Sequence, residues 1–287
     1  MVLLAAMLWG TTGTAQTLVP AGLPAPWVGA LRLLVSGAFF WVYAVAGSRS
    51  QSLGAYFKNM QWPWVLLGGA SMAAYNLTFF AGVKASSVAV GTAIALGSGP
   101  IWAGLFQMLL TRRSPAAVWW LGTLLAVAGG GLMVLGSAQQ LSISTAGVGL
   151  CLVAGVSYAV YTLVSKRLVA HTPASIVTLG IFSCAALIAL PAAFAVSGVP
   201  STSIQGWWVV LYLGVAATGI AYLLFTHALS RISSATAMSM CLVEPLTAFC
   251  LAIGVIGERP PAAAFAGLAL VMLGLALVVR AELRNMA

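Results

Sequence analysis

Ten long apolar segments separated by short linkers constrain the fold of this chain more than any single motif. A helix needs about 20 apolar residues to cross a bilayer, because no water there can bond to its backbone. Ten segments of that length leave no stretch for a separate soluble domain. The sequence therefore predicts an all-α integral membrane protein, one compact membrane domain with ten transmembrane helices. The segments cover roughly residues 2–19, 26–46, 63–83, 88–110, 116–136, 147–168, 175–196, 206–230, 234–256 and 262–281.

The scarcity of charge indicates the same class. Among 287 residues there are 12 Lys and Arg and 3 Asp and Glu, so 5% are charged and 62% are hydrophobic. Soluble domains carry about 25% charged residues, so a soluble globular protein is excluded. The net charge of +9 would indicate a nucleic-acid partner only in a soluble chain. Four cysteines lie in apolar runs without CxxC spacing, which predicts no disulfide and no zinc site. They are Cys151, Cys184, Cys241 and Cys250.

Basic residues predict the orientation, because the cytoplasmic loops of membrane proteins are rich in Lys and Arg. With the N-terminus inside, most of the basic residues fall on the cytoplasmic side. They are Arg49, Lys58, Arg112, Arg113, Lys166, Arg167, Arg231, Arg280 and Arg284. The outer loops hold Lys84 and Arg259, and Arg32 lies within the second span. We therefore expect both termini to be cytoplasmic.

The first span has one feature of a signal peptide, since Gly13-Thr14-Ala15 loosely resembles a cleavage site. It has no basic n-region, however, and the repeat described next needs this span as the partner of the sixth. We expect it to remain in the protein.

The second half of the chain repeats the first. Residues 75–87 read YNLTFFAGVKASS and residues 222–234 read YLLFTHALSRISS, with Tyr, Ala, a basic residue and Ser-Ser in register. The match continues through a later proline in each half, so spans three to five match spans eight to ten. The remaining spans match in pattern only. We expect one five-helix repeat in residues 1–140 and a second, inverted repeat in residues 141–287.

An odd number of spans in each repeat means that the two copies insert in opposite senses. Inverted repeats of this kind are typical of secondary transporters, whose substrate binds near the midplane between the repeats. Alternating access uses this symmetry, whereas an enzyme or a receptor gains nothing obvious from it. The repeat therefore predicts a secondary transporter.

Several elements, in this order, resemble the drug/metabolite transporter superfamily. They are LLAAMLWGTTGTA in the first span, ALRLLVSG in the second, the two basic-Ser-Ser hairpins, Glu244-Pro245, and Gly257-Glu258 after the ninth span. More narrowly, the whole chain is similar to the EamA-type ten-helix exporters. One departure is Arg112-Arg113-Ser114, which stands where the family often carries the Gly-Glu-Arg turn that the second half keeps.

This resemblance implies a carrier in the bacterial inner membrane that exports amino acids or related metabolites, and the family includes aromatic amino-acid exporters. The outward direction rests on the resemblance alone. The alternative is a multidrug or nucleotide-sugar carrier of the same fold. Anionic sugar nucleotides need several bases facing the cavity, and only Arg32 lies inside a span.

Two charged residues inside the spans are functional candidates, because a charge in the bilayer is costly. Glu244 lies about ten residues into the ninth span, where it predicts a proton-coupling site or a contact for a substrate ammonium. A structural acid is the alternative. Arg32 lies a turn or two into the second span and either binds a carboxylate with its planar fork or extends to the outer headgroups. Proton coupling and facilitated diffusion remain equally open.

Aromatic residues midway along several spans predict a cavity with an apolar wall and a few polar points, or else interhelical packing. Such a cavity accepts an apolar or aromatic side chain. The candidate substrate-binding residues are Trp9, Arg32, Tyr75, Asn76, Phe79, Ser98, Gly99, Tyr158, Tyr161 and Tyr222. Six other tryptophans lie near span ends and predict membrane-interface belts. They are Trp62, Trp64, Trp119, Trp120, Trp207 and Trp208.

Two helix breaks are predicted at corresponding positions of the two halves. Gly97-Ser98-Gly99-Pro100 interrupts the fourth span and Glu244-Pro245 the ninth. Paired breaks of this kind indicate a binding site, because they free backbone groups near the midplane. Close helix packing through small residues is the competing explanation.

Other function classes lack their residues. Two separated histidines without acidic neighbours predict no metal site, no GxxxxGK[ST] loop is present for ATP, and the absence of Asp excludes a Ser-His-Asp triad. The spans offer too few regularly spaced polar residues for a channel. We therefore expect neither an enzyme nor a bound cofactor. The partners expected are a small-molecule substrate and the lipid bilayer, for a monomer or a homodimer.

Overall fold

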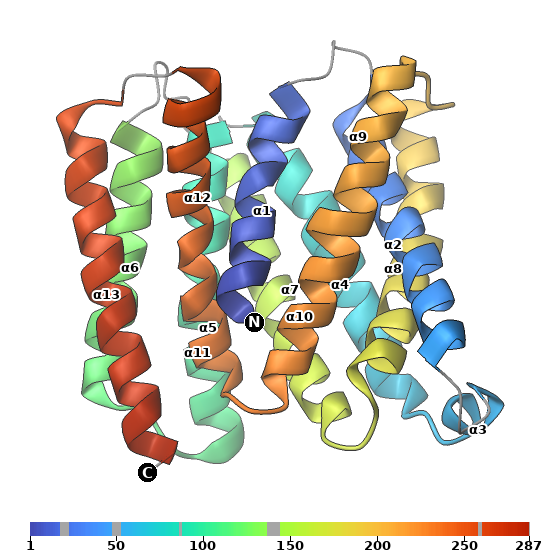
Figure 1. Ribbon diagram of the computed structural model, residues 1–287, viewed down its shortest axis with the longest axis horizontal. Helices are drawn as coiled ribbons and strands as arrows, with labels where there is room; N and C mark the ends of the chain where they lie inside the picture. Colours follow the sequence, from blue (N-terminus) through green and yellow to red (C-terminus); the bar gives the residue numbers. More distant parts are fainter. Residues whose placement is uncertain (18–22, 48–52, 86–87, 137–143, 258–259, 287) are drawn as a thin grey trace.

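A computed structural model describes residues 1–17, 23–47, 53–85, 88–136, 144–257 and 260–286, and every element within them is helical. Eight helices are long and apolar enough to cross a membrane, and two shorter apolar helices, Val2–Thr12 and Ala117–Met133, accompany them. All of them lie roughly parallel in one bundle (Figure 1). The protein is therefore an all-α, multi-pass membrane protein.

Within its described residues, the first half of the chain forms six helices. Five of them begin and end within two residues of the expected spans, and one short helix was not predicted. They are α1 (Val2–Thr17), α2 (Ala25–Gly47), the short α3 (Leu53–Lys58), α4 (Trp62–Ala85), α5 (Val88–Thr111) and α6 (Ala117–Gly136).

The second half is less regular, because two of its expected spans consist of several helical pieces. The elements are α7 (Thr145–Val169), α8 (Ala174–Ser197), α9 (Ile204–Gly214), the π-helix η1 (Val215–Ile220), α10 (Ala221–Leu229), α11 (Ser234–Met240), the 3₁₀ turn η2 (Cys241–Val243), α12 (Glu244–Leu251), the π-helix η3 (Ala252–Ile256) and α13 (Ala262–Met286). α13 continues five residues beyond its expected end at residue 281.

Serine caps begin three of these helices where the sequence leaves the apolar run. The side chains of Ser144, Ser203 and Ser233 accept hydrogen bonds from backbone N–H groups three residues later. Such caps satisfy N–H groups that have no partner within the helix. At the other end of span nine, Gly257 ends η3 with φ 78°, a left-handed conformation that suits glycine.

The connections alternate between the two ends of the bundle (Figure 1). The C-terminal ends of α3, α5, α7, α10 and α13 lie at the same end. Most of the basic residues expected on the cytoplasmic side belong to these ends. The repeated Ser86-Ser87 hairpin, Arg49 and the Glu258-Arg259 turn lie outside the described residues.

Glycines bring α6 and α13 into close contact. A Cβ added at Gly122 would lie 2.7 Å from the Gly274 carbonyl oxygen, and one added at Gly129 would lie 2.6 Å from that of Gly267. No larger side chain fits at these crossings, and small residues are the usual means of close helix packing in membranes. These glycines therefore join two helices of one chain.

The predicted break at Gly97-Ser98-Gly99-Pro100 is wrong, because α5 continues as one α-helix through Pro100. Its small residues serve packing instead. A Cβ added at Gly155 of α7 would meet the Ser98 hydroxyl and would lie 3.3 Å from the Gly99 backbone nitrogen. The competing explanation, close approach of two helices, thus describes this segment.

Candidate substrate-binding site

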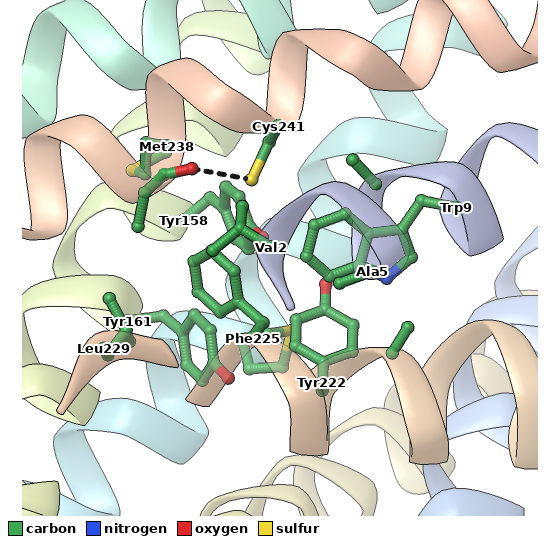
Figure 2. Packing of buried hydrophobic residues seen from close by; sticks show 14 of the residues in the cluster. Val2, Ala5, Trp9, Tyr158, Tyr161, Tyr222, Phe225, Leu229, Met238 and Cys241 are labelled. Carbon is green, nitrogen blue, oxygen red and sulfur yellow. Dashed lines mark hydrogen bonds between the residues drawn. The ribbon is translucent and has the colours of Figure 1, made fainter. Parts of the chain in front are cut away.

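Aromatic side chains from α1, α7 and α10 meet inside the bundle (Figure 2), and Tyr75 of α4 contacts them. The ring centroids of Trp9 and Tyr222 lie 4.9 Å apart, and those of Tyr75 and Tyr158 lie 5.0 Å apart. Tyr161 stacks on Tyr158 at 5.8 Å. These five residues come from α1, α4, α7 and α10, so the fold brings together the aromatic residues that the sequence singled out.

Two phenylalanines extend this group and were not predicted. Phe225 lies 5.5 Å from Trp9 and Phe182 lies 4.8 Å from Tyr222, between ring centroids. Phe225 follows Tyr222 by three positions, a helical spacing that places both on one face. Phe225 could have been predicted from that spacing, whereas no pattern in the sequence around Phe182 indicates that it belongs to the cluster. With Phe79, which stacks on Tyr75 at 5.9 Å, we call these eight residues the aromatic cluster.

Polar atoms inside the aromatic cluster lack partners. The Trp9 indole nitrogen and the Tyr158 hydroxyl are buried without a hydrogen bond. Within the described residues, no protein group bonds to the hydroxyls of Tyr75 or Tyr222 either. Buried polar groups are nearly always paired, so such exceptions need an explanation. These atoms make the cluster a candidate ligand-binding site.

Two other polar groups near the cluster bond to the protein. The Tyr161 hydroxyl lies 3.4 Å from the Thr226 hydroxyl, and the Cys241 thiol donates to the Ala237 carbonyl oxygen at 3.1 Å. Figure 2 shows Cys241 above Tyr158.

Glu244 is the first residue of α12, directly after the 3₁₀ turn η2. Its side chain is partly buried, and in the part of the chain that the structure describes no hydrogen bond or ion pair reaches its carboxylate. Pro245 follows at the start of α12, where a missing N–H costs nothing. The predicted break in span nine is present, and it presents an unpaired acid midway along the span.

Arg32 extends from α2 toward the second half of the chain. Its Nε donates to the Thr218 hydroxyl in η1 at 3.1 Å. Within the described residues, no salt bridge joins Arg32 to Glu244. The side chain is thus directed into the bundle, which disfavours the interpretation that it extends to the outer headgroups.

Three of the candidate residues contact helices or backbone groups outside the aromatic cluster. The Asn76 amide donates to the Met72 carbonyl oxygen of its own helix at 2.9 Å, and its oxygen faces Gly29 of α2. Ser98 and Gly99 contact α7 at Gly155. Because Asn76 follows Tyr75 by one position, it lies on a different face of α4.

The belt prediction is wrong for Trp119. Its side chain is 3% exposed, its indole nitrogen is buried without a partner, and its ring lies against Gly104 of α5. Trp62, Trp207 and Trp208 are exposed, as a belt requires. A glycine on the facing helix makes room for the ring, and the sequence of α6 alone does not reveal that neighbour.

Apolar hollows on the described surface lie elsewhere. One of about 760 Å³ lies between α1, α12 and α13 and is lined mostly by aliphatic side chains such as Leu3, Leu246 and Met272. Another, of about 650 Å³, lies between α1, α10 and α12. They offer few polar groups to orient a ligand. The described residues also contain no group of three His, Cys, Asp or Glu that could hold a metal ion.

Comparison with known proteins identifies the family of this bundle. The model of the EamA-like transporter family matches residues 1–135 and again residues 145–280. The chain belongs to the EamA-like transporter family. The protein is therefore a membrane transporter, and the resemblance seen in its sequence is confirmed.

A relative and a solved structure agree with this membership. The EamA-family chain is 38% identical over 284 residues to a Bacillus subtilis (strain 168) protein named "Uncharacterized transporter YwfM", covering 99% of this chain and 94% of that protein. A crystal structure with 20% identity superposes with a TM-score of 0.84 and covers 97% of this chain and 95% of its own. At that identity, the likeness shows the fold alone.

Proposed function

We propose that this EamA-family protein is a secondary transporter that exports amino acids, including aromatic or apolar ones, across the bacterial inner membrane by alternating access. The observation that carries the proposal is the aromatic cluster with unpartnered polar atoms, accompanied by Arg32, which bonds to Thr218 in η1, and by Glu244 at the start of α12. An amino acid has a carboxylate for the guanidinium fork and an ammonium for the carboxylate. Its side chain then packs among the rings.

The packing of the rings defines what binding requires. Tyr222 packs between Trp9 and Phe182, with ring centroids 4.9 Å and 4.8 Å apart, so these rings occupy the space that a substrate side chain would take. A substrate enters only when these rings separate. In our proposal this separation is part of the change between inward-open and outward-open states.

The proposed transporter has ten transmembrane helices in two inverted five-helix repeats. Support comes from the two matches of the family model, each to about half of the chain, and from the shorter apolar helices α1 and α6 that complete the count. We place both termini in the cytoplasm, because the basic residues lie at the end of the bundle that holds the C-terminus. The functional unit is proposed to be a monomer, since the α6–α13 glycine contact lies within one chain.

Glu244 is proposed as the coupling residue. An unpaired carboxylate within a span is costly unless it is neutralised by a proton or by a ligand cation. A substrate ammonium and a proton can therefore compete for the same carboxylate, which couples their movements. Facilitated diffusion without a proton is the alternative mechanism.

Reconstitution into proteoliposomes tests this function. Uptake of labelled phenylalanine, leucine and other amino acids is measured with and without an imposed pH gradient. We expect saturable uptake of phenylalanine that responds to the gradient, and loss of that response in Glu244→Gln. Glu282→Gln is the matched control, because it neutralises an acid that lies outside the cluster.

Each contrary result rejects a different part of the proposal. Uptake of none of the amino acids rejects the substrate class and leaves a multidrug carrier, which an aromatic cluster also suits. Uptake that ignores the gradient rejects coupling and leaves facilitated diffusion. A nucleotide-sugar carrier is disfavoured by the single arginine at the cluster.

A further inference from the structure

The partner of Arg32 lies in an irregular part of span eight. The π-helix η1 runs over Val215–Ile220 between α9 and α10. Within it, the fully buried Thr218 hydroxyl donates to the Leu213 carbonyl oxygen at 2.7 Å and accepts from Arg32 Nε at 3.1 Å. A threonine in an α-helix bonds three or four residues back, whereas this bond spans five. The wide turn therefore sets where the hydroxyl lies.

The same stretch lets α2 approach closely. A Cβ added at Gly214 would meet Val35 and would lie 3.4 Å from the Arg32 carbonyl oxygen. One added at Gly219 would lie 2.6 Å from the Phe39 ring. The two glycines on either side of Thr218 thus hold α2 against η1. π-helical turns of this kind are frequent at functional sites.

The bond from Nε determines which N–H donors of the guanidinium stay available to a ligand. Arg has five N–H donors, and Nε carries one of them. With Nε engaged by Thr218, the two terminal nitrogens keep four donors, and no protein acceptor within the described residues takes them. Those two nitrogens form an end-on fork that matches the two oxygens of a carboxylate.

Thr218 lies next to the aromatic cluster, because it precedes Tyr222 by four positions, and residues four apart lie on one face of a helix. The bond to Thr218 therefore holds the Arg32 side chain on the side of span eight that carries Tyr222. We infer that Thr218 is a positioning residue: by holding Nε, it directs the Arg32 fork at the substrate and so favours substrates that carry a carboxylate. This inference rests on the proposed function and adds to it the residue that sets carboxylate selectivity.

Transport by Thr218→Val and Thr218→Ser tests the inference, with labelled phenylalanine and with phenethylamine, which lacks the carboxylate. We expect Thr218→Val to raise the KM for phenylalanine about tenfold, the equivalent of one lost hydrogen bond, with little change in kcat. Phenethylamine should be unaffected, and Thr218→Ser should restore the KM. Thr178→Val is the matched control, since this buried hydroxyl bonds only to its own helix.

A double-mutant cycle on thermal unfolding tests whether the Thr218–Arg32 hydrogen bond exists, independently of its role in transport. Thr218→Val should lower the unfolding midpoint by about 2–4 °C in the wild type, and by clearly less in an Arg32→Met background. Equal shifts in both backgrounds would overturn the contact. An equal rise in KM for both substrates, or no rise, would overturn the positioning role while the proposed function stands. If the wild type transports no amino acid, the proposed function fails, and the positioning role falls with it.

Discussion

Spans four and nine correspond in the repeat, and each contains a proline, yet they differ in structure. α5 passes through Pro100 as a continuous helix, whereas the span from Ser234 to Ile256 changes helix type at η2 and again at η3. The difference lies in the preceding residues and in the neighbouring helix. Small residues precede Pro100 and lie against Gly155 of α7, while the partly buried, unpaired Glu244 precedes Pro245.

This contrast assigns different tasks to the two spans. A proline in a helix interior removes one hydrogen bond, and in α5 the surrounding helices tolerate that loss. In span nine the proline lies at the start of a new helix, where it removes no bond, and the acid beside it lies at that helix's N-terminus. Span four is thus one continuous helix, whereas span nine is irregular and carries a charge.

The crossing at Gly10 should give the largest effect on stability. A Cβ there would lie 2.6 Å from both the Glu244 carbonyl oxygen and the Thr247 side chain, next to the break. Gly10→Ala should cost about 2–3 kcal/mol of the free energy of unfolding, because a backbone must move. Gly155→Ala at the α5–α7 crossing should cost less, since the nearest atom is the Ser98 hydroxyl, which can rotate away.

Unfolding of the purified variants in detergent measures both changes. Gly149→Ala is the control, because nothing lies within 4 Å of a Cβ at that position. Equal losses for Gly10→Ala and Gly155→Ala would show that the two crossings are equally rigid, contrary to the contrast drawn here.

The two prolines should respond in opposite ways. Pro100→Ala should raise stability by about 1–3 kcal/mol, because it restores a helical hydrogen bond within α5. Pro245→Ala should change stability by less than about 1 kcal/mol, because the residue lies in the first turn of α12. Thermal unfolding compares them directly, and a gain from Pro245→Ala that matches the gain from Pro100→Ala would remove the distinction between the spans.

The start of span nine is fixed by an acid from another helix. Glu282 of α13 accepts from the Ser233 backbone N–H at 3.1 Å and from the Thr236 hydroxyl at 2.6 Å. Glu282→Gln should therefore lower stability by about 1 kcal/mol, since it removes a carboxylate from a helix N-terminus. The effect should shrink when Ser233 and Thr236 are first replaced by alanine, and an undiminished loss in that background would separate the acid from this cap.

Much of the fold was predictable because the apolar runs end at charges, prolines and polar pairs. The aromatic residues were predictable as a group because they lie midway along their spans. The contacts between helices could not be predicted from the sequence. α5 packs against Gly155, and Trp119 is buried against Gly104. The position of the Thr218 hydroxyl depends on a π-helix. Nothing in the local pattern of α5 or η1 encodes those partners.

Binding of labelled phenylalanine to the purified protein tests the central claim most directly, with phenethylamine and 3-phenylpropionate as competitors. The account predicts saturable binding, and competition at least about tenfold weaker when either the carboxylate or the amine is missing, because each loses a charge-assisted contact with Arg32 or Glu244. Competition by both analogues as strong as that of unlabelled phenylalanine, or no saturable binding, would contradict it.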